Sequence, residues 1–290
     1  MSSPAPEKEY YDGPLGDNVI IGDSGDNEIR AGRAIDIIDG LEGNDIITSL
    51  YGDDTIYGGE GDDIIYADNV QSFWGRWFSG VDYVLAGAGN DLVFGGGGND
   101  ILKGNEGDDE IHGGKGDDTL EGGLGDDVLH GGEGNDRLFA SAGNDILNGG
   151  DGDDLLRGGS SGNSSFYGGD GNDHISSGFL MDYTLAHGGA GDDRIYIHDA
   201  DATVTGGTGA DTLHFRGEGS GNVLINDFNA AEGDILELQY SFIDAPPTEL
   251  TYNYDHSGDL VLHWADWEFT LEGQTYEEVA GAITGDAILA

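Results

Sequence analysis

The chain has 290 residues, which is room for one long domain or two short ones. Its 58 Asp plus Glu residues face only 10 Lys plus Arg residues, so the formal net charge is −48. This charge disfavours nucleic acid and anionic membranes as partners and favours cations. The absence of cysteine excludes disulfides and thiolate metal sites, and no apolar run is long enough for a membrane span.

Residues 1–12 are predicted to form a short flexible leader, with two prolines and several charged side chains. The opening MSSPAPEKEYYDG lacks the apolar stretch of a secretory signal peptide. The sequence therefore fits a cytosolic protein, or one exported by a route that recognises the C-terminal end of the chain.

A nine-residue period dominates the middle of the chain and is clearest over residues 95–157. Cut into nines, this stretch begins GGGGNDILK, GNEGDDEIH, GGKGDDTLE and GGLGDDVLH. The template is Gly-Gly-x-Gly-[Asn/Asp]-Asp-x-aliphatic-x, and a fixed period of this kind indicates a repeat architecture. The repeats are predicted to span residues 13–214, with irregular inserts near 68–80, 160–167 and 176–187.

Each copy combines a turn with a short strand. The glycines favour a tight turn with exposed carbonyls, and the last three positions alternate outward, inward and outward as in a strand. Two copies then make one coil of about eighteen residues, which places Asp100 beside Asp118 and Asp109 beside Asp127. By the same spacing, His112 and His130 are expected to be neighbours on one sheet, either as a solvated pair or as a transition-metal site.

Stacked carboxylates at a strand spacing of about 4.8 Å would repel one another strongly without counterions. Carboxylate and carbonyl oxygens, without nitrogen or sulfur, select Ca²⁺. We therefore expect multiple calcium ions between stacked turns, held by the sixth-position aspartates, rather than a metal-free solenoid. The predicted ligands are Asp36, Asp45, Asp54, Asp63, Asp82, Asp91, Asp100, Asp109, Asp118, Asp127, Asp136, Asp145, Asp154, Asp173, Asp193 and Asp211.

Beyond about residue 215 the period ends, and alternating segments such as NVLINDFN, DILELQY and DLVLHW predict short strands. Residues 215–290 are expected to form an antiparallel β cap. The glycine-rich Gly158–Gly162, which matches Gly-x-Ser-x-Gly, is interpreted as a variant repeat because a hydrolase elbow needs a following helix.

The copies, GGKGDDTLE among them, resemble the repeat-in-toxin (RTX) family, the haemolysin-type calcium-binding nonapeptide. That resemblance implies an all-β fold, a right-handed parallel β-roll (β-solenoid) with a row of calcium ions along each edge and the sixth-position Asp as ligand. At the sixth position, Asn18, Asn27, Asn163 and Ala202 depart from the motif, so calcium is not implied there, and the first two sites are expected to be weaker. The C-terminal segment is similar to the serralysin-like cap, which implies an uncleaved type I secretion signal.

The expected function is that of a secreted, extracellular, non-enzymatic protein whose repeats fold on binding calcium. Its partners would be calcium ions and the type I secretion machinery, with no nucleic acid and no membrane span. One alternative is an extracellular adhesion or surface-layer module that binds glycan, or itself, through the cap or the aromatic insert 73–78. The other is an enzyme hidden in the cap or insert, for which Asp227, His256 and His263 are the only obvious candidates.

Overall fold

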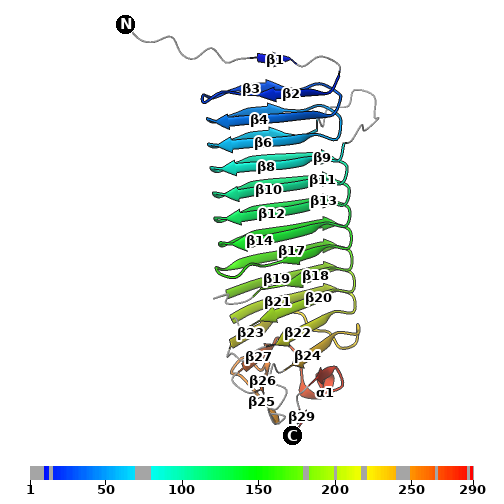
Figure 1. The fold of residues 1–290 in the computed structure, drawn as a ribbon. Coiled ribbons are helices and arrows are strands. Elements are labelled where there is room, and N and C mark those ends of the chain that lie inside the picture. The colour runs from blue at the N-terminus through cyan, green and yellow to red at the C-terminus, as the bar shows by residue number, and fades with distance from the viewer. Residues whose placement is uncertain are drawn as a thin grey trace. The chain divides into compact units, whose positions relative to one another are not determined.

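The computed structural model describes residues 10–12, 16–68, 80–178, 183–198, 201–216, 221–239, 249–264, 267–285 and 288–289. These residues form two compact units, Met1–Ala142 and Gly143–Ala290, and almost every element in both is a strand (Figure 1). The aromatic insert 73–78 and most of the predicted leader lie outside the described residues.

The strands of the first unit alternate between two parallel sheets. One sheet holds, in spatial order, β1 (Tyr10–Asp12), β3 (Glu28–Arg30), β5 (Ile46–Thr48), β7 (Ile64–Tyr66), β9 (Leu92–Gly97), β11 (Glu110–Lys115) and β13 (Val128–Glu133). The other holds β2 (Asn18–Ile21), β4 (Asp36–Glu42), β6 (Thr55–Glu60), β8 (Tyr83–Ala88), β10 (Ile101–Glu106), β12 (Thr119–Leu124) and β14 (Arg137–Ala142). Each strand therefore pairs with the strand two further along the chain.

The nine-residue period sets both the register and the core. Leu102 of β10 pairs with Leu120 of β12, and Ile111 of β11 pairs with Leu129 of β13, so equal template positions stack on one another. The eighth-position aliphatic is fully buried in these copies, whereas the flanking seventh and ninth positions are at least partly exposed. A two-residue side-chain alternation thus places one residue per copy in the core.

The fourth template position is glycine in most copies, with Ala34 as an exception. Gly116 has a φ of 119°, and a Cβ built on it would lie 1.8 Å from the carbonyl oxygen of Gly98 in the neighbouring coil. A larger residue would meet backbone atoms as well as an unfavourable φ. The second position is more tolerant, because Leu41, Asn105 and Ser141 occupy it at φ of 80°, 84° and 78°.

The second unit has the same two-sheet plan, with an addition at its C-terminal end. One sheet runs β15 (Ile146–Asp151), β17 (Ser164–Asp170), β19 (Tyr183–Ala190), β21 (Asp201–Thr208), β23 (Gly221–Ile225), β27 (Trp267–Leu271), β26 (Leu260–Trp264), β25 (Glu249–Tyr254) and β29 (Ile288–Leu289). The other runs β16 (Leu155–Arg157), β18 (His174–Ser176), β20 (Arg194–His198), β22 (Thr212–Arg216), β24 (Ile235–Gln239) and β28 (Ile283–Gly285).

Parallel pairing continues past the end of the nonapeptide period. β23 pairs in parallel with β21 and β27, and β24 pairs in parallel with β22 and β28. Among the described strand pairs, β25–β26 and β26–β27 are the antiparallel ones. The all-β parallel roll with antiparallel strands towards the C-terminus is confirmed, although the ladders extend beyond residue 214, where the period ends.

The C-terminal end of this second unit has a larger apolar core than the repeats. Phe215, Trp267 and Phe269 are at most 2% exposed, and the ring of Phe215 meets that of Phe269 edge-on at 4.9 Å between centroids. The only described helix, α1 (Tyr276–Val279), begins at Thr275, whose hydroxyl and backbone N–H both contact Glu278. No described helix is long and apolar enough to cross a lipid bilayer.

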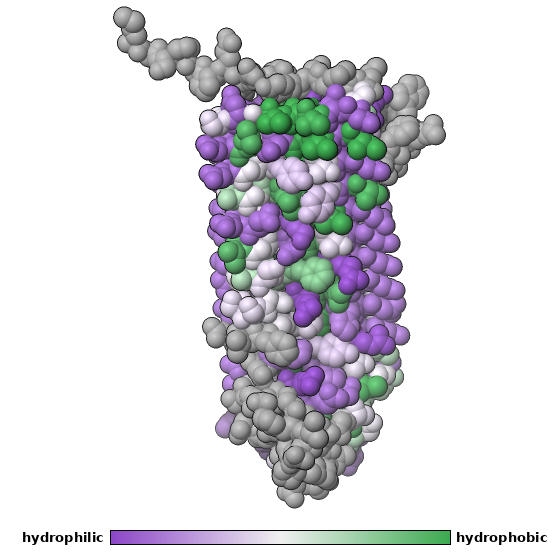
Figure 2. All heavy atoms as spheres, in the orientation of Figure 1, coloured by the Kyte–Doolittle hydropathy of each residue, from purple (hydrophilic) through white to green (hydrophobic). Residues whose placement is uncertain are grey.

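The surface of the first unit divides by residue type. Large apolar side chains are exposed on β2 and β4, where Val19, Ile21 and Ile37 are 69%, 55% and 44% accessible. Figure 2 shows such a hydrophobic group over the N-terminal strands and hydrophilic residues along the edge formed by the turns. The chain's acidic groups are thus concentrated where the strands connect.

Candidate metal centre

The sixth-position aspartates stack in two columns in the first unit, one at each edge of the roll. In each column the backbone N–H of one Asp donates to Oδ1 of the Asp in the next coil, at 2.7–2.9 Å. One column contains Asp36, Asp54, Asp82, Asp100, Asp118 and Asp136, and the other contains Asp45, Asp63, Asp91, Asp109 and Asp127. The predicted pairing of Asp100 with Asp118 and of Asp109 with Asp127 is confirmed.

All the predicted ligand aspartates are buried, at no more than 2% exposure. In many of them the second oxygen, Oδ2, is buried and has no hydrogen-bond partner. These are Asp45, Asp63, Asp82, Asp91, Asp100, Asp109, Asp118, Asp173, Asp193 and Asp211. Since a buried carboxylate oxygen without a partner is costly, such a repeated arrangement points to a cation.

In most of these copies the oxygen faces a cradle that the first-position glycine leaves open, whereas Ala86 holds that position in the copy of Asp91. A Cβ built on Gly113, the first residue of its copy, would lie 2.4 Å from Oδ2 of Asp118 and 2.7 Å from the carbonyl oxygen of Gly131. Gly104 has the same relation to Asp109, at 2.0 Å, and to the carbonyl of Gly122, at 2.8 Å. A carboxylate from one coil and a carbonyl from the next therefore converge, and both are oxygen donors that Ca²⁺ accepts.

Burial raises the pKa of these carboxyl groups in the metal-free protein. The largest cause is desolvation, and neighbouring aspartates of the same column add repulsion. The pKa rises to about 8 for Asp82 and Asp118 and to about 7 for Asp63 and Asp91. A divalent cation would relieve both effects, because it replaces the lost hydration and offsets the repulsion.

Several N-terminal copies differ because protein groups already satisfy the side chain at their sixth position, although Oδ2 of Asp45 keeps no partner. Asp36 accepts N–H groups from Asn18 at 2.9 Å and from Gly32 at 3.1 Å, and Asp54 accepts the hydroxyl of Ser49 on Oδ2. Asn27 bonds through its amide to Asp23. These contacts agree with the weaker first sites expected from Asn18 and Asn27. They also show that protein donors occupy the carboxylates of Asp36 and Asp54.

In the second unit only one edge keeps its acidic column. The backbone N–H groups of Asp154, Asp173, Asp193 and Asp211 each donate to the next carboxylate, which for Asp211 is Asp234. This row of acids therefore extends from Asp154 to Asp234.

The opposite edge of the second unit stacks Asp145, Ser164, Thr184 and Ala202. The prediction that Asn163 holds the sixth position is wrong. One extra residue in this copy moves Ser164 there, while Asn163 binds Asn144 as a fifth-position residue. Because no carboxylate follows Asp145 in this row, the two edges differ in what they offer a cation.

The nine-residue template does not predict two of the buried acids, Asp234 and Asp68. Asp234 ends the acidic column and also accepts the N–H of Asn229 at 2.6 Å. The segment Gly233–Leu236 contains the Asp-x-aliphatic pattern of a repeat, so the sequence held a signal for this acid. Asp68 accepts the N–H of Gly80 at 3.2 Å, and its Oδ1 is buried without a partner. Nothing in the period marks Asp68, because it lies directly before the insert.

The remaining candidates stand apart from these columns. The Gly158–Gly162 stretch lies between β16 and β17 with no helix after it, as expected for a variant repeat. Asp227 accepts the N–H groups of Gly206 and Gly207, and His263 contacts Asn253 and Glu268. His112 and His130 are confirmed as neighbours, since their Cα atoms are partners across β11 and β13.

The sequence profile of the RTX calcium-binding nonapeptide repeat matches seven stretches, which span residues 14–69 and 78–179 and together cover more than half of the chain. The chain belongs to the RTX calcium-binding repeat family. As an RTX protein with ladders of aspartate, it binds multiple Ca²⁺ ions, which agrees with the oxygen cradles described above. Proteins with these repeats are typically secreted.

Among solved structures, the chain matches a hyperactive, Ca²⁺-dependent, β-helical antifreeze protein from an Antarctic bacterium. It is 19% identical, with a TM-score of 0.41, over 98% of this chain and 95% of that protein. The extracellular lipase LipA of Serratia marcescens is 18% identical, with a TM-score of 0.25, over 77% of this chain and 44% of the lipase. No curated protein matches the sequence.

Proposed function

We propose that this chain is a secreted, non-enzymatic protein whose roll folds when calcium binds between its turns outside the cell. One observation carries the proposal: buried Oδ2 atoms without partners recur along both edges of the first unit. At neutral pH a folded chain with these columns empty would hold many mutually repelling charges in a poorly hydrated place. The ligands are the sixth-position aspartates, with the first-position glycine carbonyls of the adjacent coil.

The mechanism is linkage between ion binding and folding. In a compartment poor in calcium, the net charge of −48 keeps the chain expanded. At about millimolar calcium, sites with dissociation constants of about 10⁻⁴–10⁻³ M fill. Each filled site stabilises the folded state by RT ln(1 + [Ca²⁺]/Kd). Because each coil contacts only its neighbours, order spreads cooperatively along the repeats.

Circular dichroism tests this directly. The calcium-stripped chain at neutral pH is expected to give a coil spectrum, and added calcium is expected to convert it to β-structure in a cooperative titration. Magnesium at the same concentration is the control, because it binds poorly to sites built mainly from protein oxygens. A fully folded spectrum without calcium would refute the proposal.

Export is proposed to follow the type I route, with the signal in residues 270–290. This expectation draws on the similarity of the C-terminal segment to serralysin-like caps. A tagged chain without residues 270–290 should stay inside cells that carry a type I exporter, and undiminished export would contradict the assignment. Because β28 lies in the deleted part and pairs with β24, a carrier protein fused to residues 215–290 tests the signal separately from folding.

A second candidate function is an adhesion module that binds glycan through the cap. Tyr252 and Tyr254 of β25 are 48% and 46% exposed, and Tyr276 stacks on Tyr252 at 4.1 Å between ring centroids. Exposed aromatic rings of this kind can stack on a sugar ring. Glycan-array binding in calcium that is lost in Tyr254→Ala would support this function, and an array without binding would count against it.

A further inference from the structure

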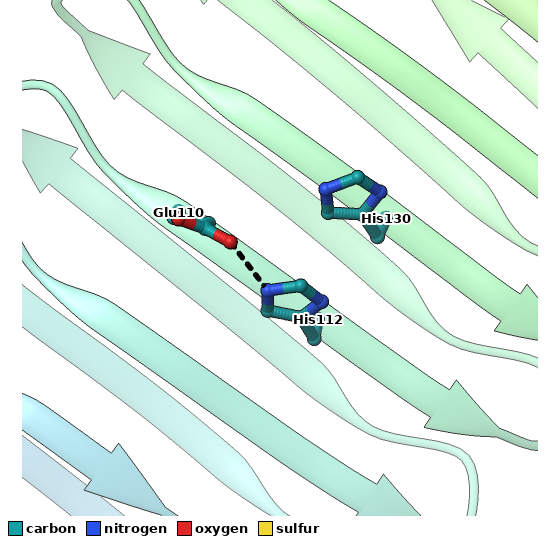
Figure 3. A group of neighbouring side chains, drawn as sticks. All are labelled: Glu110, His112 and His130. Carbon is teal, nitrogen blue, oxygen red and sulfur yellow. Dashed lines mark hydrogen bonds and ion pairs between the residues drawn. The ribbon is translucent and has the colours of Figure 1, made fainter.

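A group of three metal-binding side chains lies on the outer face of the first unit, away from the aspartate turns. Glu110 and His112 belong to β11, and His130 belongs to the adjacent strand β13 (Figure 3). One ligand atom from each of the three side chains lies within 4.8 Å of the others. Among the described residues, this is the group whose His and acidic side chains come close enough together to hold an ion.

The fold itself brings these residues together. Glu110 and His112 are two positions apart on one strand and so share a face, and Glu110 Oε1 lies 2.8 Å from Nε2 of His112. The register pairs His112 with His130, whose rings stack at 4.6 Å between centroids. The ring of Phe94 stacks on the other side of His112 at 4.8 Å, which holds the imidazole in place.

The donor set differs in kind from that of the turns. Imidazole nitrogen suits Zn²⁺, Cu²⁺ and Ni²⁺, whereas Ca²⁺ takes oxygen ligands. Two imidazoles and one carboxylate give a tetrahedral ion three protein ligands and one open position. The side chains of His112 and Glu110 are 32% and 54% exposed, so an ion can enter from solvent.

We propose that Glu110, His112 and His130 bind one divalent transition-metal ion of the zinc and copper class, separately from the calcium ions in the turns. Because the ligands come from two successive coils, the ion links β11 to β13 and stabilises the calcium-loaded roll. Two other described imidazoles have different surroundings: His187 stacks on Tyr167, and His214 pairs with Glu237 at 3.1 Å and packs against the ring of Tyr196.

Isothermal titration of the calcium-saturated full chain with Zn²⁺ tests the proposal. We expect one zinc ion per chain and a higher melting temperature once it is bound. His112→Phe and His130→Phe should each weaken zinc binding at least about tenfold. Phenylalanine at either position preserves the row of stacked rings to which Phe94 belongs. His187→Phe is the matched control and should bind zinc like the unchanged protein.

Two further measurements distinguish loss of the metal site from misfolding of the variants. Glu110→Gln leaves both rings in place and should also weaken zinc binding. With Cu²⁺ as the probe, electron paramagnetic resonance should show nitrogen coupling from two imidazoles in the unchanged protein and from one in His112→Phe. Zinc binding that is absent in the unchanged protein, or equally tight in the two His→Phe variants and in His187→Phe, would overturn the proposal.

Discussion

At the scale of single residues, the two oxygens of a sixth-position aspartate have different roles. Oδ1 of Asp118 accepts the backbone N–H of Asp100 at 2.7 Å and so helps to hold the turn, while Oδ2 faces the cradle at Gly113. The neighbouring fifth position is exposed and is Asp or Asn in most copies, with Ile35 and Val81 among the exceptions. Two adjacent acids in one turn therefore have different expected roles.

Asp118→Asn is expected to remove calcium from its cradle and to lower the melting temperature in calcium. The amide can still accept the N–H of Asp100, but it lacks the negative charge that attracts the ion. Isothermal titration should show fewer ions bound, and circular dichroism should show a higher calcium concentration at the folding midpoint. Asp117→Asn is the control, since Asn99 holds the equivalent place one coil earlier. Equal effects of both substitutions would contradict the role given to Asp118.

At the scale of the element, each column of sixth-position aspartates is a set of acids whose pKa values rise together when the chain folds without metal. Folding raises the pKa of Asp82 and Asp118 from 3.8 to about 8, and that of Asp100 and Asp109 to about 6, mainly through burial. The folded chain therefore retains protons that the unfolded chain has already released. This proton uptake makes calcium-free folding depend on pH.

The calcium-free chain is expected to gain β-structure and stability as the pH falls from about 8 towards about 5. For each carboxyl with a raised pKa, the stability is fully present below its unfolded pKa of 3.8 and is lost as the pH rises through its folded pKa, near 8 for Asp82 and Asp118. Thermal melts of calcium-stripped protein followed by circular dichroism measure this. In saturating calcium the trend should vanish or reverse, because protons then compete with the ion. A calcium-free melting temperature that rises with pH would contradict the argument.

At the scale of the whole molecule, the repeats end in a layer with a conventional apolar core. β23 and β24 continue the two parallel ladders of the second unit, and β27 and β28 pair with them. Phe269 of β27 is fully buried and contacts both Phe215 and Trp267. Since terminal coils of a solenoid need a partner for their exposed ends, this layer is expected to lower the calcium needed for folding.

Phe269→Ala should destabilise the folded state by about 3–5 kcal/mol, the usual cost of deleting a buried aromatic side chain. The measurement is the calcium concentration at the folding midpoint, which should rise, together with a lower melting temperature at fixed calcium. Glu268→Ala, on the exposed face of the same strand, is the control, because surface ion pairs are worth little. A midpoint unchanged by Phe269→Ala would show that the cap is not coupled to the repeats.

Local spacing in the sequence is enough to predict the repeat geometry. Residues such as Leu102 and Leu120 recur at one template position, so the coil length, the inward side chains and the pairing of Asp100 with Asp118 follow from local spacing. Calcium as the cation follows from the oxygen-only donors in the turns. These features depend on neighbouring residues within one or two copies, and an unbroken period keeps them in register.

The three-dimensional contacts are needed to show which acids lack partners and where the columns end. Asp68 takes its partner Gly80 from the far side of the insert, and the extra residue before Ser164 shifted a register that the template placed at Asn163. The continuation of the parallel ladders past residue 214 depends on pairing across distant segments, which no local period encodes. Inserts change the spacing between coils, so contacts across them have to be seen in three dimensions.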